Sequence, residues 1–195
     1  MVVLRGSRLP HVVGTRHEDE FDISAGQRMT LTMTWFRSHH HAPAQHYDTT
    51  EVDASLLLLP SVGFIPADDP RFLGTVRAVE QELLRDGLVL RYRTDAGLDG
   101  LPGDEHPFLA CSFWLVTAYA MIGRLEEGHA LMRKLVVLAN DVGLMSEEYD
   151  PINERMVANC PQAFSHLALI GAANALQDAE KALSEAAPSE ETVNG

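Results

Sequence analysis

The sequence predicts a mainly α-helical fold, in two layers of helices, with a short β-stranded segment at its N-terminal end. Three observations support this prediction. Alternation of apolar and polar residues at period two is confined to roughly the first forty residues. After Pro43 the apolar residues recur at helical spacing. Helices that are apolar nearly all round alternate with amphipathic ones, as expected of an inner layer of helices covered by an outer layer.

The N-terminal segment contains two predicted strands, residues 21–24 and 29–35, joined by a turn at Ala25-Gly26-Gln27. They form a β-hairpin or two strands of a sandwich, and two strands alone need a larger sheet to join. A polar break follows, with four histidines: His39, His40, His41 and His46. Consecutive histidines point in different directions, so we expect a solvated linker here. We predict neither a metal site nor a cofactor.

The rest of the chain is predicted to be helical as far as residue 176. A short apolar helix at 51–59 is stopped by Pro60, and a second helix at 71–85 begins after Asp69 and ends at Asp86-Gly87. The remaining helices are expected at 109–122 (apolar nearly all round), 125–139 (amphipathic) and 162–176 (almost wholly apolar). The predicted organisation is therefore a β segment at 1–43, a helical domain at 44–178 and a flexible tail at 179–195.

The composition narrows the classes of partner. The chain has 195 residues, enough for one domain, and 46% of them are hydrophobic. Its formal net charge of -13 argues against a nucleic-acid partner and against binding to an anionic membrane. No apolar run approaches the length of a membrane span, and the first residues do not resemble a signal peptide. We therefore expect a cytoplasmic protein in which Cys111 and Cys160, both in apolar segments, are buried thiols.

The stretch GLMSEEYDP, residues 143–151, places two adjacent carboxylates, Glu147 and Glu148, in a polar turn between apolar helical segments. Gly143 and Pro151 restrict the backbone on either side of this turn. Carboxylates on a turn at the end of rigid helices are well placed for general acid/base chemistry. Taken alone, however, the stretch favours a solvated pair, because most carboxylates are exposed.

Five segments together resemble glycoside hydrolase family 15, which includes glucoamylases, glucodextranases and bacterial trehalases. They are DASLLLLP (53–60), LRYRTDAGLDGLPGDE (90–105), FLACSFWL (108–115), NDVGLMSEEYDP (140–151) and NCPQAFSH (159–166). The resemblance runs from about Gln45 to Leu176. It implies part of an (α/α)6 toroid, preceded by the last strands of a β-sandwich. It also implies hydrolysis, with inversion, of an α-linked glucoside such as trehalose or a malto-oligosaccharide.

The resemblance also implies roles for individual residues. Glu147 matches the general base, and Arg91 matches an arginine that contacts sugar hydroxyls. The other substrate-binding positions that it implies are Asp95, Glu105, Glu148 and Phe164. Two alternatives remain open: Arg91 as a surface arginine paired with Asp95, and Phe164 as a core residue of an apolar helix.

One expected part has no counterpart in the sequence. An inverting glycosidase needs two carboxyl groups roughly 6.5–9.5 Å apart, one of them to protonate the leaving oxygen. The family carries this acid on a Trp-Glu loop well before the 53–60 segment, and no such loop precedes Asp53 here. A substitution of this role by Asp104 or Glu105 would require the right position in the pocket, which we do not expect. We therefore expect a truncated or internally deleted relative, or a fragment of a longer reading frame, that is inactive alone.

Two further expectations follow from a partial toroid. Its inner helices expose apolar surface, at ~25 cal/mol for each Å² left in water, which favours self-association or a complementary chain. The alternative to an enzyme is a non-catalytic carbohydrate-binding or assembly module derived from the same family.

Overall fold

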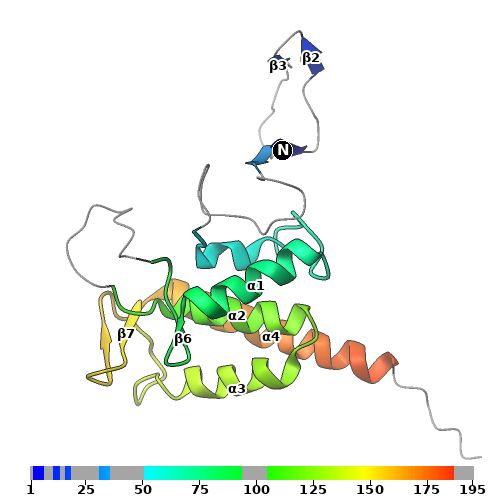
Figure 1. Cartoon of the computed structure of the whole chain (residues 1–195). Helices are drawn as coiled ribbons and strands as arrows, with labels where there is room; N and C mark the ends of the chain where they lie inside the picture. Colours follow the sequence, from blue (N-terminus) through cyan, green and yellow to red (C-terminus); the bar gives the residue numbers. More distant parts are fainter. Residues whose placement is uncertain are drawn as a thin grey trace, which may run out of the picture.

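The computed structural model describes two stretches of the chain, 51–93 and 105–186, and four short strands before them. The main body consists of a 3-10 turn, four helices and two small hairpins. The central helix is α2 (Leu109–Met121), which contacts α3 (Leu125–Val136), α4 (Ala163–Ala186) and the 3-10 turn η1 (Ala54–Leu58) (Figure 1). This mainly helical architecture confirms the predicted fold class.

The position of α2 at the centre follows from its sequence. It is apolar nearly all round, and Leu109, Phe113 and Leu115 are fully buried. A helix without a polar face is stable in water only when neighbours cover it on most sides. The buried residues of α2 join those of η1 and α1 (Pro70–Glu82) in one hydrophobic core.

Helix α1 is shorter than the sequence predicts. Asp69 caps its first turn by accepting a 2.8 Å hydrogen bond from the Arg71 N–H, but the helix ends at Glu82 instead of residue 85. Beyond it, β5 (Leu84–Arg85) and β6 (Leu88–Val89) form an antiparallel hairpin. Asp86 and Gly87 take left-handed φ angles of 50° and 72°, as a two-residue hairpin turn requires. The Asp-Gly pair is thus a hairpin signal as well as a helix stop.

Two other helical segments differ little from expectation. The segment predicted as a helix at 51–59 is the 3-10 turn η1, capped by the Asp53 side chain, which accepts a 2.7 Å bond from the Ser55 N–H. Helix α3 begins with Glu126 and Glu127 and ends with Arg133 and Lys134. These charges oppose the partial charges at the two helix ends and so stabilise the helix.

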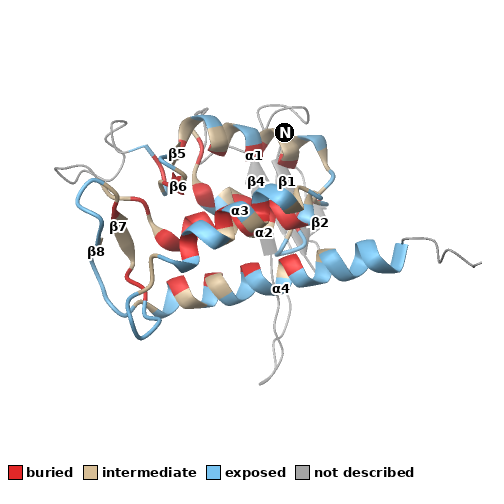
Figure 2. Cartoon of the chain, turned by 90° about the horizontal axis from the view of Figure 1, so that it is seen from below, coloured by how far each residue is buried: buried red, intermediate tan, exposed pale blue. Residues whose placement is uncertain are grey.

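Helix α4 departs most from expectation. It continues to Ala186, into the segment predicted as a tail, and residues 187–195 lie outside the described residues. It buries a narrow stripe against the body, while Phe164, Leu167, Ile170 and Leu183 are 45–64% exposed (Figure 2). The prediction of a helix buried on most sides is therefore wrong for α4. Helix α4 is long, but no helix in the two described stretches is both long enough and apolar enough to span a membrane.

The N-terminal strands are described by their backbone alone. β1 (Val2–Gly6) pairs antiparallel with β4 (Leu31–Trp35), and β2 (His11–Val13) pairs with β3 (Arg16–Glu18). The strand predicted at 29–35 is therefore present as β4, but it pairs with β1. The predicted strand at 21–24 and the four linker histidines lie outside the described residues.

The two cysteines have different environments. Cys111 is buried in α2, and burial raises the pKa of its thiol. Cys160 is exposed, so the prediction that both thiols are buried is wrong for this residue. The apolar neighbours of Cys160 in the sequence do not bury it, because it lies on the loop before α4 rather than in the helix.

Candidate functional site

The segment with the adjacent carboxylates connects α3 to α4 and forms a β-hairpin at one end of the helical body (Figure 1). Its strands are β7 (Glu148–Asp150) and β8 (Arg155–Val157), and Glu147 directly precedes β7. The hairpin is tied to the start of α2. The Leu109 N–H donates to the Glu147 carbonyl at 2.9 Å, and the Tyr149 N–H donates to the Pro107 carbonyl at 3.1 Å. The predicted polar turn is thus a defined piece of backbone fixed to the most buried helix.

The Glu147 side chain is held by one residue. The Asn159 Nδ2 donates to Glu147 Oε2 at 2.7 Å, and the Glu147 backbone N–H donates to the Asn159 carbonyl at 2.8 Å. Within the described residues, these bonds engage one carboxylate oxygen of Glu147 and leave Oε1 available. The residue is half-buried, so part of it is exposed to solvent.

The first turn of α4 supports the backbone just before Glu147. The Ser165 hydroxyl donates to the Ser146 carbonyl at 2.8 Å, and both residues are buried. His166 contacts both sides of the loop: Nε2 faces the Met145 N–H at 3.3 Å, and Nδ1 faces the Gln162 carbonyl at 2.7 Å. This pattern fits a neutral imidazole whose proton is on Nδ1, because a carbonyl accepts and an N–H donates.

Three carboxylates meet at this end of the body. Burial raises the pKa of Glu148, and the negative charges of Glu105 and Glu147 raise it further. A hydrogen bond from the His106 backbone opposes the shift. Glu148 also forms a β-bridge with Phe108, the residue that precedes α2. The structure therefore brings together Glu105, Glu147 and Glu148, which are far apart or merely adjacent in the sequence.

Arg91 lies beside this cluster. Its guanidinium carbon is 5.3 Å from the ring centroid of Tyr92, and the Tyr92 hydroxyl donates to Glu105 at 3.2 Å. The charges of Arg91 and Glu105 both act on the thiol of Cys111, which places them around the start of α2. Arg91 is exposed and available to a ligand. The alternative in which it pairs with Asp95 is not tested, because Asp95 lies outside the described residues.

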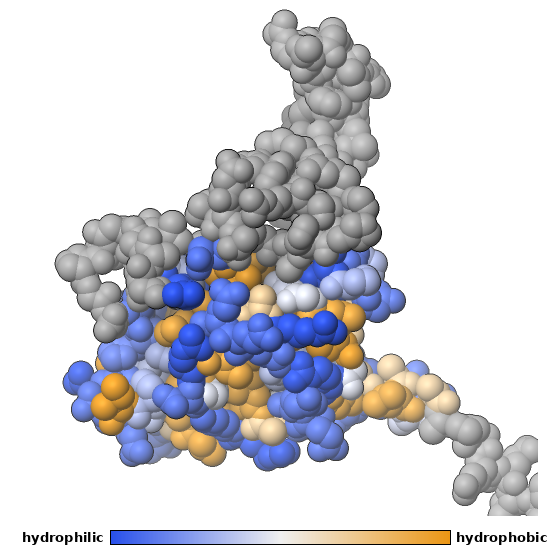
Figure 3. Space-filling model, viewed as in Figure 1, coloured by the Kyte–Doolittle hydropathy of each residue, from blue (hydrophilic) through white to orange (hydrophobic). Residues whose placement is uncertain are grey.

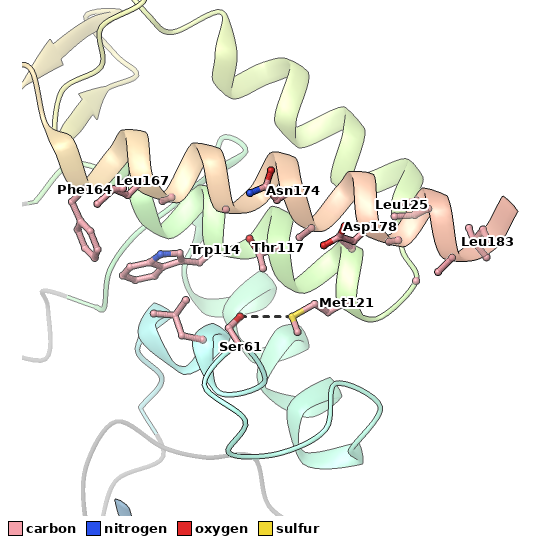
Figure 4. A pocket seen from close by; sticks show the side chains of 18 residues that line it. Ser61, Trp114, Thr117, Met121, Leu125, Phe164, Leu167, Asn174, Asp178 and Leu183 are labelled. Carbon is pink, nitrogen blue, oxygen red and sulfur yellow. Dashed lines mark hydrogen bonds between the residues drawn. The ribbon is translucent and has the colours of Figure 1, made fainter. Parts of the chain in front are cut away.

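Phe164 lies in the first turn of α4. Its ring packs against Trp114 and Phe108, with centroids 5.5 Å and 5.9 Å away. It stands at one end of an open apolar groove of about 930 Å³ between η1, α2 and α4, which reaches Leu183 at the other end (Figure 4). None of the three clustered carboxylates lines this groove. Phe164 is thus not a core residue, and the groove that it lines does not include Glu147.

The geometry of Glu147 is compatible with proton transfer. Across 51–93 and 105–186, no group of three or more His, Cys, Asp or Glu side chains is arranged to hold a metal ion. A carboxylate with one oxygen held and the other available can accept a proton from a water molecule. Reasoning from the sequence identified Glu147 but missed Asn159 and Ser165, although both lie in the NCPQAFSH segment.

Comparisons with known proteins identify the family to which the chain is similar. The profile of the family described as glycosyl hydrolases family 15 matches residues 15–174. A trehalase of Mycolicibacterium smegmatis is 48% identical over 128 residues, which are 66% of this chain and 19% of the relative. A trehalase of Thermoplasma acidophilum is 46% identical over 136 residues, which are 69% of this chain and 23% of the relative. The chain thus spans about a fifth of the length of these curated relatives.

Solved structures show the same fold. A wild-type glycosidase superposes with a TM-score of 0.55 and 22% identity, covering 67% of this chain and 37% of the other. A variant glycosidase in complex with glucose matches equally well, with a TM-score of 0.55 over the same shares. About two thirds of this chain therefore has the fold of part of these glycosidases. On the profile match and these relatives together, the chain belongs to family 15 of the glycosyl hydrolases.

Proposed function

We propose that this chain carries the general-base half of an inverting α-glucosidase site, with Glu147 as the base. The observation that supports this most directly is the hydrogen bond from Asn159 to Glu147 Oε2, which leaves Oε1 for a water molecule. The relatives at 46–48% identity are described as trehalases, which favours trehalose over a malto-oligosaccharide as substrate.

In this proposal Glu147 Oε1 accepts a proton from a water molecule as that water attacks the anomeric carbon. The water approaches from the face opposite the leaving oxygen, so the configuration inverts. Arg91, Glu105 and Glu148 hold the sugar hydroxyls, since guanidinium and carboxyl groups suit that contact. Asp95 is a further polar contact that the resemblance to the family implies.

A proton donor for the leaving oxygen is the remaining requirement. We propose that a complementary segment of a family 15 catalytic domain, in another chain or elsewhere in the same polypeptide, supplies this carboxylic acid. Without such a donor, the loss of general acid help costs on the order of 10²–10⁴ in rate. The proposal therefore predicts very slow hydrolysis by this chain alone and faster hydrolysis with the complementary segment.

The apolar groove along α4 is the surface that we assign to this segment. It is lined by Trp114, Phe164, Leu167 and Leu183, with little charge apart from Asp178 (Figure 4). Figure 3 shows further apolar surface on the projecting end of α4. Leu167 and Leu183 are 64% and 61% exposed, which is wide exposure for large aliphatic side chains on one helix. An apolar helical segment bound in the groove would bury these exposed side chains, as in other helix-in-groove contacts.

The assay for the catalytic proposal is release of glucose from trehalose and from maltose, at high enzyme concentration. Glu147→Gln is expected to abolish the activity, whereas Glu154→Gln, at an exposed position in the same hairpin, is expected to leave it unchanged. Equal turnover by Glu147→Gln and the unsubstituted chain would overturn the role of Glu147.

The alternative function is a non-catalytic carbohydrate-binding or assembly module. The exposed Arg91 beside Tyr92, and the exposed ring of Phe164, favour sugar binding even without turnover. Isothermal titration with trehalose distinguishes the two functions: binding with no glucose release at any enzyme concentration, alone or with a complementary segment, supports the module.

The groove is tested by size-exclusion chromatography with light scattering. We expect self-association of the isolated chain, reduced by Leu167→Gln with Leu183→Gln and not by Val137→Gln, which changes an exposed residue outside the groove. A sharp, well-folded monomer at all concentrations would contradict the expected self-association.

A further inference from the structure

We propose that Asn159 is a positioning residue that aims the Glu147 carboxylate, and that a β-bulge at Ala158 brings it there. This inference rests on the proposed role of Glu147 as a base. It concerns a residue that does not touch the reacting atoms and acts through Glu147.

The bulge follows from the register of the hairpin. The strand pairs are Glu148 with Val157 and Tyr149 with Met156, so a regular ladder would next place Ala158 opposite Glu147. Instead the Glu147 N–H donates to the Asn159 carbonyl at 2.8 Å, which leaves Ala158 as an extra residue between the end of β8 at Val157 and this bond. Bulges of this kind re-aim a side chain and occur often beside active sites.

The backbone of Ala158 provides independent support for the bulge. Its φ is 59°, in the left-handed region that residues with a β-carbon avoid. Ala158 is exposed. Strained backbone persists where the surrounding structure requires it, and such positions gather at functional sites. Here the left-handed residue allows Asn159 to meet Glu147 with both its main chain and its side chain.

These two contacts give Glu147 a fixed orientation. The backbone bond fixes the start of the side chain, and the 2.7 Å bond from Nδ2 fixes its end. A long, flexible glutamate would otherwise sample several rotamers. Catalysis by a base requires its oxygen within hydrogen-bond reach of the water it activates, so a defined Oε1 position raises the rate without changing substrate affinity.

The hairpin contains a matched control for this contact. The Asn153 Nδ2 donates to Asp150 Oδ2, also at 2.7 Å, but the proposal gives Asp150 no part in the reaction. The two asparagines thus make the same bond, of the same length, to different carboxylates of one hairpin. A purely structural role predicts similar consequences for both, whereas a positioning role singles out Asn159.

The first measurement is independent of activity and uses the side-chain amide resonances of the ¹⁵N-labelled full chain. Glu147→Ala should speed exchange of the Asn159 Nδ2 protons with water by about tenfold, the equivalent of one hydrogen bond to a charged group, and leave the Asn153 resonances unchanged. Unchanged exchange at Asn159 would overturn the proposal, whether or not the chain hydrolyses trehalose.

The second measurement uses the trehalose assay. Asn159→Ala is expected to lower kcat by about ten- to a hundredfold, the scale of a misplaced catalytic group, with KM unchanged within about twofold. Asn153→Ala should leave kcat unchanged. The nearly isosteric Asn159→Asp should move the pH optimum of kcat towards acid, where the new carboxyl group is protonated and donates again.

The outcomes separate this inference from the proposed function. The positioning role is overturned if Asn159→Ala lowers kcat no more than Asn153→Ala does. It is also overturned if Asn159→Ala raises KM and leaves kcat unchanged. Absence of any turnover in the unsubstituted chain, alone or with a complementary segment, counts against the proposed function, and the exchange measurement then decides the contact between Asn159 and Glu147.

Discussion

Ser165→Ala tests whether the first turn of α4 supports the loop that carries Glu147. The Ser165 hydroxyl donates to the Ser146 carbonyl at 2.8 Å, and both residues are fully buried. Alanine would leave that carbonyl without this donor in a site where water has little access. An unsatisfied buried polar group costs about 1–3 kcal/mol, so we expect a loss of about 1–2 kcal/mol once the better helix propensity of alanine is included.

Ser184→Ala is the matched control. The Ser184 hydroxyl donates to the Lys181 carbonyl, also at 2.8 Å, but near the exposed end of the same helix. Water replaces that donor at once, so the free energy of unfolding should change by less than about 0.5 kcal/mol. The two substitutions share residue type, helix and bond length, and differ in burial.

Urea unfolding followed by circular dichroism and tryptophan fluorescence measures the difference. For a urea dependence of about 1–3 kcal/mol/M, the midpoint of Ser165→Ala should fall by roughly 0.3–2 M relative to Ser184→Ala. Equal midpoints for the two variants would refute the reasoning, because burial of the bond would then contribute nothing. A lowered midpoint for Ser165→Ala, with Glu147-dependent turnover also reduced, would link the helix to the loop.

Three other predictions concern the same hairpin. Ala158→Gly should raise the free energy of unfolding by about 0.5–1 kcal/mol, because glycine adopts the φ of 59° without strain, and a thermal melt should show an upward shift. Hydrogen bonds from Asn153 and Ile152, and from Arg155, lower the pKa of Asp150 to about 2, so its stabilisation is full above the unfolded pKa and is lost as the pH falls towards 2. Acid unfolding of Asp150→Asn should therefore lack part of this dependence. The pKa of Glu148 is raised by burial first, so its ionisation destabilises the folded chain as the pH rises, and Glu148→Gln should gain more melting temperature at pH 7 than at pH 4.

Particular elements show how far the sequence predicts the fold. Helix α2 was predicted almost to its observed ends, because an apolar pattern of that length is satisfied only by burial. The same pattern misled at α4, since an apolar sequence does not reveal whether a neighbour is present to cover it. At Asp86-Gly87 two local signals compete, a helix stop and a hairpin turn, and the pairing of β5 with β6 decided in favour of the hairpin.

The candidate site divides in a similar way. Glu147, Glu148, Glu105 and Arg91 were identified from the sequence, and the structure brings them to one end of the body, although their roles stay predictions. Asn159 was not identified, because its contact with Glu147 depends on a bulge. A one-residue shift in strand register reverses which side chain faces a given partner, and no local propensity reports that shift.

The sequence by itself determined the family, the helical class and the loop that carries the carboxylates, because these depend on residue identity and spacing along the chain. Only the tertiary structure decided that Ala158 bulges, that Asn159 holds Glu147 and that α4 leaves an apolar groove open. These features arise from contacts between segments that are distant in sequence or out of regular register. The free energies of these contacts depend on distances and angles between residues, and those are set only when the whole chain has folded.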